Sequence, residues 1–164
     1  MTQITIRDVH PADYARIVDI NEIEVQQTSA MNLARLADLD GLASYHKVAL
    51  VDGRVAAFLL AMRENAPYQN ENYSWFAARF QKFVYVDRIV VANEFSGLKI
   101  GSLLYADLFD FAKAQGIKTI TCEYNIQPPN PASKNFHDKF GFKELDTQWV
   151  ANGTKKVTLQ AAQV

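Results

Sequence analysis

The most constraining stretch of this chain runs from Phe83 to Leu104 and reads FVYVDRIVVANEFSGLKIGSLL. Its first part, Phe83 to Val91, is a nearly continuous apolar run rich in β-branched and aromatic residues, which is typical of a strand buried on both faces. Small residues follow at Ser96, Gly97 and Gly101, where a helix start can bring backbone N–H groups close to an anion. The stretch therefore predicts a strand, an anion-binding turn and a helix that crosses back over the sheet.

Length and charge narrow the class of protein. A chain of 164 residues predicts a single domain over residues 1–164. Seventeen basic and eighteen acidic residues give a net charge of -1 without a basic run, so we do not expect a nucleic-acid partner. The N-terminus lacks the apolar core of a signal peptide, and no stretch approaches the roughly 20 apolar residues of a membrane span. We therefore expect a cytoplasmic protein with no membrane contact.

The cysteine count excludes further classes. Cys122 is the single cysteine, so the sequence offers no internal disulfide and no paired thiolates for a zinc site, and we expect no metal. Its place in an apolar run favours a small apolar role over that of a nucleophile.

The N-terminal half predicts a strand, two helices and a hairpin. Proline at the first position of a helix and an Asp-Gly turn between two apolar runs supply the boundaries. Leu33, Leu36 and Leu39 lie in helical register within the second helix. The elements are a strand over Gln3–Arg7, a helix from Pro11, a helix over Met31–Leu42, and strands over Val48–Val51 and Val55–Met62 joined by Asp52-Gly53.

Two connections in this half are candidates for binding. Glu24 to Ser29 is either an ordinary connection or a loop that faces a substrate. Arg63 to Gln81 predicts a long surface loop followed by a short helix, and loops of this length are often functional. Its aromatic residues, Tyr68, Tyr73, Trp75 and Phe76, either line a substrate pocket or pack in the core.

The C-terminal half predicts a parallel strand–helix–strand unit, another helix and a hairpin. Gly116 and Gly141 follow helical patterns at the position of a C-terminal cap, and Asn130-Pro131 is a typical helix start. We expect Phe136 and Phe140 to point into the core. The elements are helix Gly101–Gln115, strand Ile117–Cys122, a helix from Asn130 to Gly141, and strands Phe142–Val150 and Lys155–Leu159 joined by a tight Asn152-Gly153 turn.

Polar and charged residues interrupt two apolar strands. Asp87 and Arg88 lie within one, and Glu123 and Asn125 lie near the end of another. A buried carboxylate is costly unless it is paired or lies at an open cleft. Asp87 either pairs with Arg88 or a loop amide, or lies at the carboxyl end of a parallel strand where open sheets bind ligands.

The order of elements and two motifs resemble the GNAT acyltransferase superfamily over essentially the whole chain. The family's phosphate signature is Gln or Arg, two residues, Gly, one residue, then Gly or Ala, and it falls here on Ser96 to Gly101. The last glycine matches, whereas Ser96 replaces Arg or Gln and Lys99 replaces the middle Gly. The segment NPASKNFHDKFGF, Asn130 to Phe142, is similar to the family's pattern of Asn, Ser three residues later, Tyr or His, and Gly-Phe, with His as in phosphinothricin-type enzymes.

This resemblance implies an α/β (α+β) GNAT fold, with a central mixed sheet of about seven strands flanked by about four helices. It implies acetyl-CoA as cofactor and a primary amine of a small molecule as acceptor, with a homodimer as one expected assembly. The implied catalytic residues are Asp87 as first base, Glu123 as second, and His137 as acid. The implied cofactor residues are Ile89, Val90, Val91, Ser96, Gly97, Leu98, Lys99, Ile100, Gly101, Ser102, Asn130, Ser133 and Phe136, and the implied substrate residues are Asn21, Tyr73, Trp75 and Tyr85.

Two other function classes remain open from the residues. The departures at Ser96 and Lys99 suit a non-catalytic acyl-CoA or ligand-binding module with the same fold. A nucleotide-phosphate enzyme needs a phosphate-loop lysine followed by Ser or Thr, but Lys99 is followed by Ile100. The sequence thus predicts an N-acetyltransferase, with the binding module as its alternative.

Overall fold

The computed structural model describes residues 2–25 and 28–164, and it divides the chain into two compact units. The first unit holds residues 1–62 and 86–111, and the second holds residues 63–85 and 112–164. Each unit is therefore built from two separate parts of the sequence. A single domain over residues 1–164 stays a prediction.

The described residues form seven strands and five α-helices, in agreement with the predicted α/β class and with one helix more than expected. Hydrogen bonds join the strands in the order β1-β2-β3-β4-β5-β7-β6. The strands are β1 Ile4–Asp8, β2 Tyr45–Val51, β3 Arg54–Arg63, β4 Val84–Val91, β5 Thr119–Gln127, β6 Lys143–Val150 and β7 Lys155–Gln163; the helices are α1 Tyr14–Ile23, α2 Leu33–Leu42, α3 Glu71–Ala77, α4 Ile100–Ala114 and α5 Pro131–Asp138.

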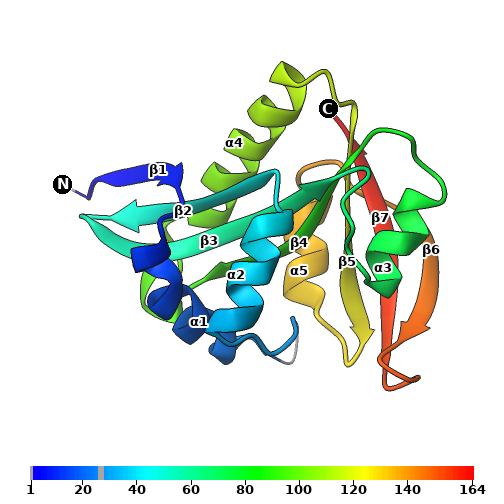
Figure 1. Ribbon diagram of the computed structural model, residues 1–164, viewed down its shortest axis with the longest axis horizontal. Helices are drawn as coiled ribbons and strands as arrows, with labels where there is room; N and C mark the ends of the chain where they lie inside the picture. Colours follow the sequence, from blue (N-terminus) through cyan, green and yellow to red (C-terminus); the bar gives the residue numbers. More distant parts are fainter. Residues whose placement is uncertain (1, 26–27) are drawn as a thin grey trace. The chain divides into compact units, whose positions relative to one another are not determined.

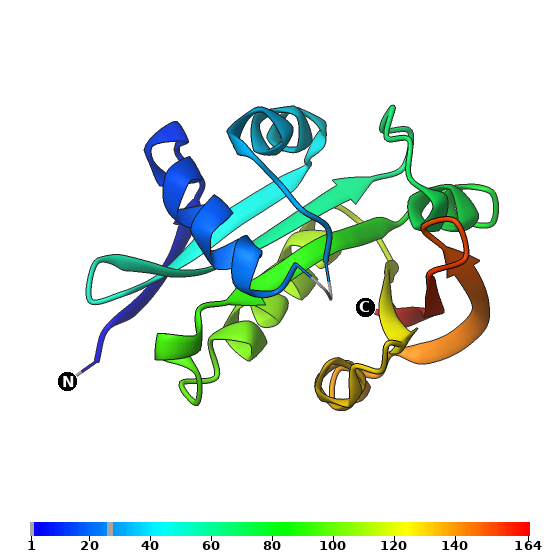
Figure 2. The same cartoon turned by 90° about the horizontal axis from the view of Figure 1, so that it is seen from below.

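In the first unit, α1 and α2 lie on one face of strands β1 to β3 and α4 lies on the other (Figure 2). Two neighbouring residues of β2 contact helices on opposite faces of the sheet, because successive side chains of a strand point to opposite sides. The Tyr45 hydroxyl donates to Asp107 of α4 at 2.7 Å, whereas His46 Nδ1 lies 2.7 Å from Asp40 of α2. The two helix layers bury the centre of the sheet, so that Phe58 to Met62 of β3 are fully buried.

The second unit contains the curved sheet β5-β7-β6 with α3 and α5 packed against β5 (Figure 1). The first residues of β4 pair with β5 in parallel, Val84 opposite Ile120 and Tyr85 opposite Thr121. This pairing confirms the predicted parallel strand–helix–strand unit. Gly116, with a φ of +70°, ends α4 as its position predicted.

The three leucines of α2 are in helical register as predicted; Leu36 and Leu39 are buried, whereas Leu33, the first residue of the helix, is 54% exposed. Two other local predictions are wrong. Phe136 and Phe140 are only half-buried, because the register of α5 turns His137 inward instead. The last hairpin turn spans residues 151–154 rather than two residues, because the left-handed conformation already begins at Ala151.

No described helix is both long and apolar enough to cross a membrane.

Candidate active site

An exposed loop joins β4 to α4 in the first unit. A short 3-10 helix, Asn93–Phe95, ends at Ser96, and Ser96 to Lys99 are all exposed before α4 begins at Ile100. Gly97 has a φ of +83°, and a Cβ added there would meet nothing within 4 Å. The predicted strand, turn and helix are therefore present, with open space at the turn.

Lys99 explains how the loop tolerates its departure from the family pattern. Its φ is +60°, a left-handed conformation in which glycine is favoured because it has no Cβ. Lysine adopts the same conformation here at a cost of roughly 1–2 kcal/mol. The backbone path that a glycine would give is thus preserved, and the substitution adds a positive charge.

The start of α4 has the chemistry of an anion-binding site. The first N–H groups of a helix have no partner within the helix, and the helix dipole favours an anion there. Leu103 N–H donates to the carbonyl of Lys99 at 3.1 Å, so Lys99 occupies the N-cap position before α4. Because the lysine side chain has donors and no acceptor, it cannot cap this helix start itself.

Asp87 of β4 pairs with its neighbour. Its side chain is 4% exposed, and its Oδ2 accepts from Arg88 Nε at 2.7 Å. One of the two alternatives left open by the sequence, pairing with Arg88, is therefore present. The three residues predicted to meet the pantetheine arm, Ile89, Val90 and Val91, complete this strand before the loop.

Asn21 of α1 belongs to the same network. It is fully buried, and its Nδ2 donates to the Ser29 carbonyl at 2.9 Å while its Oδ1 accepts from Arg88 Nη1 at 3.2 Å. Its predicted role in substrate binding stays a prediction. Of the candidate loop Glu24–Ser29, residues 26–27 lie outside the described residues.

In the second unit, Tyr85 and Glu123 come together as a pair. The Tyr85 hydroxyl donates a short hydrogen bond to Glu123 Oε1, and the Tyr85 ring is buried against Tyr68, Tyr73 and Phe76. These rings pack in the core, which is one of the two alternatives that the sequence left open. The Tyr85 side chain is therefore buried, with its hydroxyl bound to a carboxylate.

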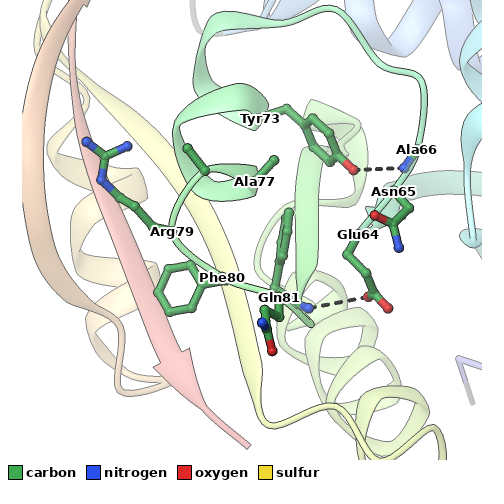
Figure 3. A pocket seen from close by; sticks show the side chains of 10 residues that line it. Glu64, Asn65, Ala66, Tyr73, Ala77, Arg79, Phe80 and Gln81 are labelled. Atoms are coloured by element: carbon green, nitrogen blue, oxygen red, sulfur yellow. Dashed lines mark hydrogen bonds between the residues drawn. The ribbon is translucent and has the colours of Figure 1, made fainter.

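The loop and helix after β3 do line a pocket of about 390 Å³, although only one predicted substrate residue contributes (Figure 3). The pocket is formed by residues 64–66, 73, 77–81 and 83. Tyr73 accepts from Ala66 N–H at 3.1 Å and donates to the Arg63 carbonyl at 2.6 Å. Trp75 lies outside the lining, with the Arg79 guanidinium 3.8 Å from its ring centroid.

The start of α5 confirms the predicted cap. Asn130 precedes Pro131 and its side chain accepts from Ser133 N–H at 3.2 Å. This bond satisfies an N–H group of the first turn, and proline has none to satisfy. Unlike α4, α5 therefore begins with its own acceptor in place.

His137 is the buried residue of α5. It is 4% exposed, and Phe136 and Phe142 pack edge-on against its ring with centroids 5.2 and 5.1 Å away. Its Nδ1 lies 2.7 Å from the Ser133 carbonyl, which can only accept, so Nδ1 carries the proton. Burial lowers the pKa of His137, although the Ser133 carbonyl and Asp138 raise it. The ring is therefore neutral near pH 7, with its lone pair on Nε2.

The predicted residues thus form local groups within each unit. The first unit holds Asp87, Asn21, the strand residues Ile89 to Val91 and the loop Ser96 to Lys99. The second unit holds Tyr85, Glu123 and the α5 motif. Arg88 and Ser29 were missed as members of the site. The signal for Arg88 was a cation in the middle of an apolar strand, whereas nothing in the sequence pointed to Ser29.

Comparison with known proteins identifies the family. The model of the acetyltransferase (GNAT) family matches residues 12–142. Phosphinothricin N-acetyltransferase of Streptomyces coelicolor is 41% identical over 59 residues, which are 36% of this chain and 33% of that protein. The chain thus aligns with about a third of the length of this relative.

Solved structures share the fold. Ard1 of Thermoplasma volcanium matches with a TM-score of 0.79 at 17% identity, covering 98% of this chain and 97% of its own. YncA of Salmonella typhimurium, solved with its cofactor acetyl-CoA, matches with a TM-score of 0.70 at 22% identity, covering 98% and 94%. With the family model spanning most of the sequence, the chain belongs to the acetyltransferase (GNAT) family, whose cofactor is acetyl-CoA.

Proposed function

We propose that this protein transfers the acetyl group of acetyl-CoA to the primary amine of a small molecule. The observation that carries the proposal is the exposed loop Ser96 to Lys99, which leads into α4 and ends on a lysine whose side chain cannot cap the helix. Support for a small amine comes from the segment that is 41% identical to phosphinothricin N-acetyltransferase. The ribosomal-protein-S18-alanine N-acetyltransferase of Escherichia coli shares the fold at 16% identity, so it does not favour a protein acceptor.

The cofactor residues divide into three groups. Ser96 to Ser102 bind the pyrophosphate through backbone N–H groups, with Lys99 adding a point charge. Ile89 to Val91 pair with the pantetheine arm through the backbone of β4. Asn130, Ser133 and Phe136 of the α5 motif are assigned to the thiol end of the cofactor. When bound, acetyl-CoA supplies an activated thioester.

Attack by an amine requires that a base remove its proton. Asp87 is our first candidate, because Arg88 holds its carboxylate in a fixed orientation. Glu123 is the second candidate, and its partner is the neutral Tyr85 phenol. Asp87 is therefore oriented by a positively charged group, whereas Glu123 is oriented by an uncharged one.

His137 completes the proposed mechanism on the side of the leaving thiolate. Its neutral ring has the proton of Nδ1 engaged with the Ser133 carbonyl, so Nε2 accepts a proton before it donates one. We therefore assign His137 as a relay that takes up the proton released by the acceptor amine and passes it to the thiolate. Its lowered pKa fits this role, because it makes the imidazolium a stronger acid that gives its proton up readily.

A thiol-release assay tests the function. Acetyl-CoA is mixed with the protein and with phosphinothricin, L-lysine, spermidine or a tetrapeptide that begins with alanine. Release with phosphinothricin, lysine or spermidine, in clear excess over the tetrapeptide, supports a small-molecule acetyltransferase. Acetyl-CoA binding without release from any acceptor would instead establish the non-catalytic binding module.

Matched amide variants rank the two bases. Asp87→Asn and Glu123→Gln keep size and hydrogen-bonding capacity but remove the charge. Loss of a general base lowers turnover by about 10²–10⁴-fold, so the variant of the true base shows this loss in kcat. Equal turnover in both variants and in the wild type would remove both carboxylates from the mechanism.

A further inference from the structure

Arg88 ties three separate parts of the first unit to one guanidinium. Nε donates to Asp87 Oδ2 at 2.7 Å, and Nη1 donates to Asn21 Oδ1 at 3.2 Å. Nη1 also donates to the Ser29 carbonyl at 3.0 Å, and Nη2 donates to Ser29 Oγ at 2.9 Å. One side chain thus connects β4, α1 and the segment between α1 and α2.

The burial of this guanidinium is informative. The Arg88 side chain is 4% exposed, as is that of Asp87. A buried ion pair is a poor source of stability, because well-packed apolar residues of similar volume often stabilise a fold equally well or better. What arginine offers in their place is a planar fork of donors with fixed geometry. The network is therefore better explained by orientation than by stability.

Ser29 is the point at which this network reaches the surface. Its carbonyl accepts from both Arg88 Nη1 and Asn21 Nδ2, the latter at 2.9 Å, which occupies both lone pairs. Thr28 Oγ1 adds a bond to Asn21 Oδ1 at 3.3 Å. Ser29 itself is exposed to solvent although three hydrogen bonds hold it. A molecule at the surface can therefore contact a residue that Arg88 fixes relative to Asp87.

We propose that Arg88 is a positioning residue that sets the acceptor specificity of the enzyme. It fixes the carboxylate of the candidate base and the surface residue Ser29 in one geometry, so that an amine held beside Ser29 presents its nitrogen to Asp87. This inference rests on the proposed function, because it takes Asp87 as a base. It adds that the strength of acceptor binding depends on the guanidinium fork, whereas that of acetyl-CoA does not.

The test compares four variants in the thiol-release assay, with the acceptor of the panel above that the wild type uses fastest. Ser29→Ala keeps the carbonyl and loses only Oγ; it is expected to raise the KM of the acceptor about three- to tenfold. Arg88→Met is expected to raise it more than tenfold and to lower kcat, since Asp87 loses its orientation. Arg88→Lys keeps the charge without the fork and is expected to fall between the wild type and Arg88→Met.

Arg7→Met is the matched control. Arg7 also lies in the first unit and binds Asp13 through two hydrogen bonds, of 2.8 and 3.0 Å, but it does not bind the segment around Ser29. The KM of the acceptor in this variant is expected to equal that of the wild type. The KM of acetyl-CoA is expected to stay within twofold of the wild type in all four variants, a split that a general loss of structure would not produce.

The outcomes separate the two proposals. An unchanged acceptor KM in Ser29→Ala and Arg88→Met, with an active wild type, would overturn the positioning role alone. A parallel loss in kcat and in both KM values would overturn it as well, because it would indicate a purely structural residue. No thiol release by the wild type with any acceptor would overturn the proposed function and this inference together.

Discussion

The starts of α4 and α5 are chemically different, although both belong to family motifs. α5 keeps the motif and is preceded by Asn130, whose side chain accepts from Ser133 N–H. α4 departs from the motif and is preceded by Lys99, whose side chain has no acceptor. A side chain of the protein therefore caps α5, whereas the Lys99 side chain cannot cap α4. Whether a helix start matches the family motif and whether it can bind a ligand are therefore separate properties.

The largest effect is expected from a variant of α5 that lowers turnover but leaves acetyl-CoA binding unchanged. His137→Gln removes the relay and is expected to lower kcat about 100-fold, while the dissociation constant of acetyl-CoA stays within twofold of the wild type. Steady-state kinetics and titration calorimetry measure the two quantities. His46→Gln is the control, since His46 is also buried, at 7% exposure, but pairs with Asp40 in the first unit. Equal turnover in wild type and His137→Gln would remove His137 from the mechanism.

The second prediction closes the open helix start. Lys99→Asp places a carboxylate at the proposed pyrophosphate site, so the dissociation constant of acetyl-CoA is expected to rise at least tenfold, or about 1.4 kcal/mol. Lys113→Asp makes the same charge change in the last turn of α4 and is the control. If both variants bind acetyl-CoA equally well, the pyrophosphate does not lie at the start of α4.

The third prediction concerns pH. Burial lowers the folded-state pKa of His46 and of His137 below the ordinary value of about 6.5. The unfolded chain therefore binds more protons than the folded protein below about pH 6.5. Stability is accordingly expected to fall as the pH drops from 7.5 to 5.5, by up to about 1.4 kcal/mol per pH unit for each histidine. Urea unfolding at these two values measures the loss.

The variants His46→Gln and His137→Gln assign this pH dependence. Each is expected to flatten the dependence of the unfolding free energy on pH relative to the wild type. The ionised carboxylates with lowered pKa values, Asp13 and Glu64, lose their contribution only at lower pH. A stability that stays constant from pH 7.5 to 5.5 would contradict the burial of both rings in neutral form.

The smallest expected effect tests the capping difference itself. Asn130→Ala removes the acceptor at the start of α5 and is expected to lower the free energy of unfolding by about 1 kcal/mol. Lys99→Ala removes no acceptor and is expected to cost less than about 0.5 kcal/mol. Chemical denaturation of both variants gives the comparison. Equal losses of unfolding free energy in the two variants would contradict the capping difference between α4 and α5.

Local signals explain why much of the fold could be predicted from the sequence. The cap at Asn130, the left-handed Gly116 and the Asp52-Gly53 turn depend on a few neighbouring residues, and all three lie where the pattern placed them. The burial of a side chain depends on packing and was less predictable. Leu33 lies in helical register but at the exposed first turn, and the register of α5 buried His137 in place of two phenylalanines.

Only those parts of the candidate site that lie within a single strand or motif could be predicted from the sequence. Asp87 was visible as a carboxylate within an apolar run, and Arg88 as its neighbour. The bonds from Arg88 to Ser29 join residues 59 positions apart, so no local pattern encodes them. Likewise, the bond between Tyr85 and Glu123 spans 38 positions and depends on how β4 pairs with β5.

The lysine that opens α4 also has a consequence for handling the protein. An anion that binds the exposed loop at this helix start binds the folded protein and not the unfolded chain, so ligand binding and heat resistance are linked. Acetyl-CoA at a hundredfold excess over its dissociation constant adds about 2.7 kcal/mol to the folded state, or roughly 5–10 °C in Tm for a chain of this size. A melting curve with and without acetyl-CoA thus reports whether a purified sample is loaded, before any acceptor is known.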